Sequence, residues 1–314
     1  MNARTWYGDC CRTSSLLVAF LAAPPAAAQI PWRLEHPVQA RITGNFADGR
    51  ISESSGVAAS RGVPGLLWTQ NDSGNPPFVF ATDTTGASRG TFGLRGAQNE
   101  DWEDISLGPC GKLTCLYLAD TGDNRERRPF ATVYRVPEPS LPAKHPRERV
   151  AVGPAQSVSF RYPDGPHDVE AMWIAPNGDV HLVSKGRSGP VEHFRVPAAA
   201  WGSRKLSTAQ LVERLPITVR SRSDRVTGAA LSPDSRLVAI RTYSTVYFFV
   251  PGDDGRLRVP GEAIACDVRG LGVQGEGVSW LDARRLALTS EQSLLPAGTI
   301  AVAQCPLPSP FAKR

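Results

Sequence analysis

The stretch Asp101-Trp102-Glu103-Asp104-Ile105 carries the pattern around which this sequence is organised. It alternates polar or acidic residues and leads into a short apolar run. Similar stretches recur at four other places, and aligning the five copies matches these residues: Ser55, Glu103, Glu170, Thr227 and Glu276. The steps between them are 48, 67, 57 and 49 residues. A recurring unit of about this size, with four short strands in each unit, is typical of the blades of a β-propeller.

The segments between these motifs hold short β-rich runs separated by Gly, Asn, Asp and Pro, which is the pattern of strands and turns. A content of 29 Gly and 27 Pro also suits a turn-rich all-β chain. The last unit lacks a fourth strand, whereas residues 38–46 form a strand that stands alone before the first unit. Pairing the two would close the ring and protect its edges.

We therefore predict an all-β fold, a five-bladed β-propeller of four-stranded blades closed by an N-terminal strand. Six blades of about 45 residues are the alternative. The long step between Glu103 and Glu170 is the place where a sixth, degenerate blade would lie.

Residues 1–28 have the features of a secretory signal peptide. A positively charged start is followed by an apolar run at 16–23, which is too short to span a bilayer, and then by three alanines at 26–28. We expect residues 29–314 to form a single propeller domain, with no transmembrane segment and a secreted or periplasmic location.

The net charge of +5 is small for 314 residues and is spread along the chain. A nucleic-acid-binding surface needs Lys and Arg gathered on one face, so the sequence predicts no nucleic-acid partner. The densest basic run, Arg125-Glu126-Arg127-Arg128, is interpreted as a solvated loop.

Four cysteines follow the predicted signal peptide, and an even number in an exported chain favours disulfides. Cys110 and Cys115 flank a hairpin-like turn, and Cys266 and Cys305 then pair by default. The C-x4-C spacing, with no neighbouring C-x2-C or H-x3-H, argues against a zinc site.

The predicted fold brings the motifs together on one face. In each blade the inner strand starts on the face where the antiparallel second strand ends. Carboxylates that converge there repel one another, and a cation, Lys or Arg, or protonation must neutralise them. Oxygen ligands suit hard ions, and we expect Ca2+.

We assign roles to these residues as hypotheses. The expected metal ligands are Glu103, Glu170 and Glu276. Lys185 and Arg241 are candidates to hold an anionic group, and Asp101 or Asp168 is a candidate base for water. Further residues expected to line the pocket are Asn71, Asp72, Asp120, Asp123, Asn124 and His167.

A structural interpretation of the same residues stays open. Carboxylates at strand starts also staple adjacent blades by accepting hydrogen bonds from backbone N–H groups. For Asp104 and Glu53 we favour a staple or a solvated position over a role in the site. His181 and His193 lie in predicted strands and are interpreted as packed or surface residues.

Several motifs also carry a family resemblance. They are the run 51–58 with Asn71-Asp72-Ser73-Gly74, Trp102-Glu103-Asp104-Ile105, Gly122-Asp123-Asn124, Tyr134-Arg135-Val136-Pro137 and His167-Asp168-Val169-Glu170-Ala171. They resemble an uncharacterised family of exported bacterial β-propeller proteins, over most of the mature chain. The resemblance implies the fold and no reaction.

A weaker similarity links Asp168-Val169-Glu170-Ala171 and Gln274-Gly275-Glu276-Gly277 to β-propeller phytases, and the style of metal site is similar to that of gluconolactonase-like propellers. Ala171 and Thr227 depart from the phytase pattern.

Two functions follow from these observations. The first is a metal-dependent hydrolase that acts on a small anionic ester, such as a phosphate ester. The second is a non-catalytic propeller scaffold that binds a ligand or an envelope or extracellular protein. A monomer is expected in either case.

Overall fold

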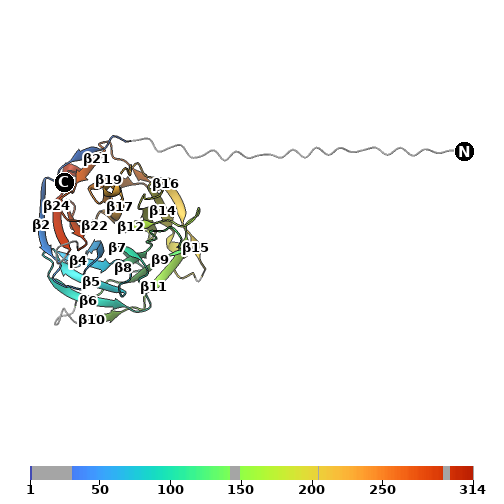
Figure 1. The fold of residues 1–314 in the computed structure, drawn as a ribbon, viewed down its shortest axis with the longest axis horizontal. Helices are drawn as coiled ribbons and strands as arrows, with labels where there is room; N and C mark the ends of the chain where they lie inside the picture. Colours follow the sequence, from blue (N-terminus) through green and yellow to red (C-terminus); the bar gives the residue numbers. More distant parts are fainter. Residues whose placement is uncertain (2–29, 142–148, 204, 293–297, 314) are drawn as a thin grey trace.

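Each of the five motifs begins the innermost strand of a separate small sheet. The inner strands are β3 (Ser54–Ala59), β7 (Trp102–Cys110), β12 (Val169–Ile174), β17 (Val226–Leu231) and β22 (Gly275–Trp280). Each contacts the next, and β22 contacts β3, so the circle closes. The computed structural model describes residues 1, 30–141, 149–203, 205–292 and 298–313. These form five sheets in a ring (Figure 1), which confirms the five-bladed propeller and excludes the six-bladed alternative.

The blades are numbered here in chain order from their inner strands. The first blade continues outward through β4 (Leu66–Asn71), β5 (Phe78–Asp83), β6 (Ser88–Leu94) and β10 (Arg149–Val152). The second continues through β8 (Leu113–Asp120), β9 (Ala131–Pro137), β11 (Gln156–Arg161) and β15 (Ser207–Thr208). The third continues through β13 (Val180–Ser184), β14 (Glu192–Val196) and β16 (Gln210–Arg214).

The fourth blade continues through β18 (Val238–Thr242), β19 (Thr245–Pro251), β21 (Ile264–Asp267) and β1 (Arg33–Glu35), with β20 (Leu257–Arg258) paired to β19. The fifth continues through β23 (Arg285–Ser290), β24 (Thr299–Gln304) and β2 (Gln39–Asn45). The short 3-10 helices η1 (Ala198–Ala200), η2 (Arg222–Asp224) and η3 (Phe311–Lys313) are the helical segments of the described chain.

The predicted closure by the N-terminal strand is confirmed. Strand β2 pairs antiparallel with β24, from Gln39 opposite Gln304 to Asn45 opposite Thr299. The last blade therefore combines both ends of the described domain, and neither β24 nor β2 is left without a partner.

Three blades differ from the predicted four strands because a further strand covers the outer edge. Strands β10, β15 and β1 pair in parallel with β6, β11 and β21. Each comes from a segment that belongs to another part of the chain, and each occupies hydrogen-bonding groups that an outer strand would otherwise expose.

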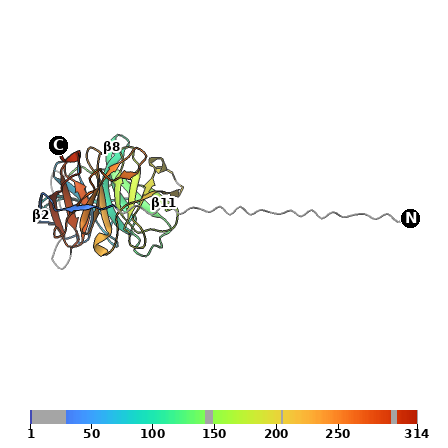
Figure 2. The same ribbon diagram turned by 90° about the horizontal axis from the view of Figure 1, so that it is seen from above.

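The core lies between the blades, with one buried hydrophobic cluster at each of the five blade interfaces. Trp68 and Trp102, for example, belong to the cluster between the first and second blades, and both are fully buried. Each sheet therefore has two apolar faces, which is why its strands read as continuous apolar runs. Figure 2 shows the resulting disc from the side.

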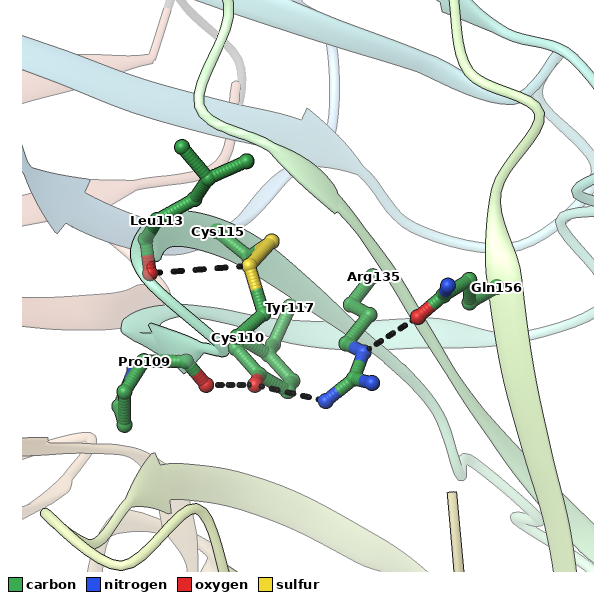
Figure 3. The surroundings of a disulfide bond; sticks show 7 residues. All are labelled: Pro109, Cys110, Leu113, Cys115, Tyr117, Arg135 and Gln156. Atoms are coloured by element: carbon green, nitrogen blue, oxygen red, sulfur yellow. Dashed lines mark hydrogen bonds between the residues drawn. A yellow bond between two sulfur atoms is a disulfide. The ribbon is translucent and has the colours of Figure 1, made fainter. Parts of the chain in front are cut away.

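Both expected disulfides form. Cys110 and Cys115 link the β7–β8 hairpin, with their Cα atoms 5.8 Å apart. Figure 3 shows that Tyr117 ties this hairpin further, because its ring hydroxyl donates to the carbonyl of Pro109. The same hydroxyl accepts a hydrogen bond of 3.4 Å from Arg135 on β9. Cys266 and Cys305 link β21 of the fourth blade to the end of β24 in the fifth.

The predicted signal peptide at 1–28 lies outside the described residues apart from Met1. Among the described residues, none of the helices has the length and apolar character that crossing a membrane requires.

Candidate functional site

A β-bulge occurs at the aligned motif residue in every inner strand. The register against the second strand shifts at Ser55, Glu103, Glu170, Thr227 and Glu276. A bulge adds one residue to a strand and re-aims its side chain. All five residues are buried, and they occupy the same end of the five inner strands.

Five carboxylates gather at this end of the inner strands, and we call them the acidic mouth: Asp72, Asp101, Glu103, Asp168 and Glu170. They form two triplets that share Glu103, the first with Asp72 and Asp101 and the second with Asp168 and Glu170. Within each triplet one oxygen from every residue lies within 4.8 Å of the others. The spacing suits the shared coordination of one cation.

Loops from three blades position these side chains. Asp72 follows β4 in the first blade, Asp101 precedes β7 in the second, and Asp168 precedes β12 in the third. Gly122, just after β8, leaves the room they occupy, because a Cβ there would lie 2.1 Å from Oε1 of Glu103 and 2.6 Å from Oδ2 of Asp101. A side chain at this position would displace both carboxylates.

Lys185 is the basic residue of the acidic mouth. It follows β13, and its Nζ contacts Oε1 of Glu170 and lies 3.9 Å from Oδ2 of Asp168. Among the described residues, no other Lys or Arg nitrogen lies within 4.0 Å of the oxygens of these five carboxylates. Burial opposes the charge of Lys185, but attraction to Glu170, Glu103 and Asp168 outweighs it and raises its pKa.

One lysine is too little positive charge for five carboxylates, and the pKa values reflect this. Burial, together with repulsion from neighbouring acids, raises the pKa of Asp101 to about 7 and that of Glu170 to about 7. Burial, followed by repulsion from Glu170 and Asp72, raises the pKa of Glu103 well above its ordinary value. Protons therefore occupy part of this site near neutral pH, unless another cation replaces them.

Glu276 lies at the fifth-blade bulge, outside the two triplets. It is buried, its Oε2 has no hydrogen-bond partner in the described structure, and burial raises its pKa well above its ordinary value. Repulsion from Glu170 adds to the effect. An unpartnered buried carboxylate oxygen is costly unless a ligand or a proton satisfies it.

Arg241 lies on β18, buried between the fourth and fifth blades. Its Nη1 donates to the carbonyl oxygens of Gly277 at 2.5 Å and Thr289 at 2.8 Å, while its Nε has no partner among the described residues. Burial lowers its pKa to about 10. These hydrogen bonds join the fourth blade to the fifth. The role of Arg241 in holding an anion stays a prediction.

Of the two positions expected for Asp104, staple or solvated, the structure shows the staple. Its Oδ1 accepts from the amide of Ile105 at 2.8 Å, and its Oδ2 accepts from the amides of Met172 at 2.8 Å and Ala229 at 3.2 Å. These amides lie on β7, β12 and β17, so one buried side chain connects three inner strands across the axis.

The remaining predicted pocket residues hold the loops around the mouth. Asn71 accepts from the amide of Glu53, Asp120 from that of Asp101, and the Asp123 amide donates to Asp168. Asn124 accepts from Arg187. His167 lies between two carboxylates, with Nε2 2.9 Å from Asp164 and Nδ1 3.9 Å from Glu192.

The interpretation of the 125–128 run as a solvated loop is wrong for Arg128. Its guanidinium is mostly buried and pairs with Asp120 at 2.9 Å and Glu100 at 3.2 Å, and it also donates to the carbonyl of Gly122. A run of charges along the chain does not indicate that one of its members is buried and paired. Arg128 supports the loop that borders Asp101 and Glu103.

No protein-family model matches the chain, and no curated protein matches it either. Among solved structures it is similar to a gluconolactonase from Xanthomonas campestris, at 15% sequence identity and a TM-score of 0.44. The match covers 90% of this chain and 99% of the other.

Proposed function

We propose that the acidic mouth binds a divalent cation, Ca2+ in the first instance, and that the protein uses it to hydrolyse a small anionic ester. One observation carries the proposal: five carboxylates in two triplets, three of them buried and two partly buried, have one lysine to balance them. Oxygen-only donors of this kind suit Ca2+, which takes six to eight oxygen ligands. The unpartnered oxygens of Asp168 and Glu276 offer further donors.

The residues divide into roles by position. Glu103 belongs to both triplets and is the central ligand, Glu170 joins it from the neighbouring third blade, and Glu276 is a further ligand from the fifth-blade bulge. A bound divalent cation would polarise an ester oxygen and lower the pKa of a water molecule. Asp101, with a pKa raised to about 7, has the value a general base needs near neutral pH.

Lys185 favours an anionic substrate. Its Nζ already lies beside Glu170 and Asp168, and a cation that draws these carboxylates away would free the ammonium to contact a phosphate or carboxylate group. Such a group is expected on the substrate, next to the ester bond.

Calorimetric titration of the chelator-treated protein with Ca2+ tests the binding step. We expect one saturable site whose affinity falls at least about 100-fold in Glu103→Gln, because charge count sets Ca2+ affinity. Glu262→Gln is the matched control, since that glutamate is half exposed and lies away from the mouth. Absence of Ca2+ binding in the unaltered protein would refute the proposal.

The catalytic step is tested on the same samples with phosphate monoesters and lactones, in the presence of Ca2+ or a chelator. We expect turnover that the chelator abolishes and that Asp101→Asn reduces while Ca2+ binding persists. Saturable Ca2+ binding without turnover of any ester would instead identify a ligand-binding or protein-binding propeller.

A further inference from the structure

A row of polar side chains lies between the third and fourth blades, away from the acidic mouth. His181 on β13 and His193 on β14 are neighbours across the third blade, and both are buried. The ring of Trp173 stacks on His181, with centroids 4.9 Å apart and planes within 10°. Glu213, which faces His193 from β16, completes the row.

The hydrogen bonds fix where the protons lie. Nδ1 of His193 is 3.2 Å from Oε1 of Glu213, and Nε2 of His193 is 2.8 Å from Nδ1 of His181. A carboxylate only accepts, so His193 carries its proton on Nδ1 and accepts at Nε2. His181 must then donate from Nδ1, which leaves the lone pair of its Nε2 available.

The surroundings keep this arrangement in place. The amide of Leu257, from the fourth blade, donates to Oε1 of Glu213 at 2.6 Å and fixes that carboxylate. Burial lowers the pKa of His181 to about 3 and also lowers that of His193, so both rings are neutral at physiological pH. Among the described residues, none donates a hydrogen bond to Nε2 of His181.

His181 lines a cavity of about 280 Å³ between the two blades. Apolar groups make up much of its wall, including Trp173, Pro176, Leu231 and Leu257. The charged residues of the wall are Arg195, Asp179 and Asp253, and Arg195 pairs with Asp179 at 3.8 Å. Gly255 keeps the space open, because a Cβ there would lie 3.6 Å from Cε1 of His181 and 3.3 Å from Nη1 of Arg195. The lining includes the turns at the far ends of β12 and β17, so the cavity lies on the face opposite the acidic mouth.

We propose that this cavity binds a small, mainly apolar molecule with one hydroxyl group, of the phenol type, whose O–H donates to Nε2 of His181. A cavity of about 150 Å³ accommodates benzene, so this one has room for a substituted ring. The fixed acceptor selects a donor, and the apolar wall selects the ring.

Titration with phenol and with toluene tests the proposal, because the two probes have similar shapes and only phenol can donate. We expect phenol to bind at least about tenfold more tightly than toluene, since an unmatched buried acceptor is costly. His181→Phe keeps a ring against Trp173 and removes the acceptor, and it should abolish the preference. Glu213→Gln should weaken the preference, and Glu262→Gln should leave it unchanged.

Nuclear magnetic resonance of the unaltered protein provides a readout that does not depend on a variant folding. Long-range correlations from ring protons to ring nitrogens should place the proton of both histidines on Nδ1, and phenol should shift the Nε2 signal of His181. A proton on Nε2 of His181 would overturn the proposal. So would phenol that binds no better than toluene, or that leaves His181 unperturbed.

Discussion

The five bulges share one backbone geometry but carry two kinds of side chain. At the first and fourth blades the bulge residue carries a hydroxyl. Ser55 donates to the carbonyl of Glu103 at 2.5 Å, and Thr227 donates to the carbonyls of Gly275 at 3.1 Å and Glu276 at 3.0 Å. Each hydroxyl thus reaches the bulge of the next blade. At the other three blades the same position holds a glutamate.

The hydroxyl side chains stabilise the ring of blades, whereas the three glutamates are not needed for that purpose. A hydroxyl satisfies a neighbouring carbonyl, whereas an ionised carboxylate has no proton to donate. Glu103, Glu170 and Glu276 therefore cannot replace the hydroxyls as staples while they are charged. They are buried at a free-energy cost that the hydroxyl positions avoid, which argues for a ligand at the mouth.

The largest effect is expected from removing the lysine that balances the glutamates. In Lys185→Met, without Ca2+, the free energy of unfolding should fall by about 3–5 kcal/mol, because a buried carboxylate loses its partner. Ca2+ should restore much of the loss. Denaturant unfolding with and without Ca2+ measures both quantities.

Lys112→Met serves as the control, since Lys112 is exposed in the β7–β8 turn. A loss below about 1 kcal/mol in Lys185→Met would mean that Glu170 is uncharged in the folded protein, and the contrast between the two kinds of bulge would weaken.

The second prediction concerns pH. Glu170, a proposed ligand, has a pKa raised to about 7, mainly by burial, so protons compete with Ca2+ below that pH. Ca2+ affinity should rise about 100-fold between pH 5 and pH 8 for one such carboxyl, because each pH unit below the pKa costs about tenfold. Titration at several pH values measures this.

The stability of the Ca2+-free protein should change in the opposite direction. A carboxyl whose folded pKa exceeds its unfolded value contributes stability below the unfolded value, and loses it as pH rises through the folded value. For Glu170 this window runs from 4.5 to about 7. A Ca2+ affinity that is the same at pH 5 and pH 8 would contradict the proposed competition between protons and Ca2+.

The third prediction uses the space that Gly122 leaves. Gly122 has no positive φ, so alanine changes only the volume at this position. Its Cβ would meet Oε1 of Glu103 at 2.1 Å and should lower Ca2+ affinity about tenfold, or about 1.4 kcal/mol. Gly62→Ala is the matched control, because nothing lies within 4 Å of its Cβ position. An unchanged affinity in Gly122→Ala would place the ligand elsewhere.

The sequence predicted the ring because the information for it is local and repeated. The motif at Glu103 returns at each inner strand, turns punctuate the strands, and an unpaired N-terminal strand matches an incomplete last blade. The gathering of Glu103 with Asp101, Asp168 and Glu170 followed from strand direction alone, since a blade's first two strands meet at one face.

Other features depend on packing that the sequence does not display. The outer strands β10 and β15 pair in parallel with β6 and β11, and the pattern of strands and turns along the chain did not predict them. Arg128 looks like part of an exposed charged run, yet Asp120 binds it. The row formed by His181, His193 and Glu213 depends on the register of three strands, which spacing along the chain does not fix.

The smallest effect should come from a hydroxyl bulge. Thr227→Val keeps the shape of the side chain and removes the donor to Gly275 and Glu276, so the free energy of unfolding should fall by about 1 kcal/mol. Ca2+ affinity should stay within about twofold of the unaltered protein, because the hydroxyl serves the ring and not the ligand. Thr227→Ser, which retains the donor, should recover most of the lost stability. If Thr227→Val instead weakened Ca2+ binding as much as Glu103→Gln does, the hydroxyl bulges would belong to the site, and the two kinds of bulge would share one role.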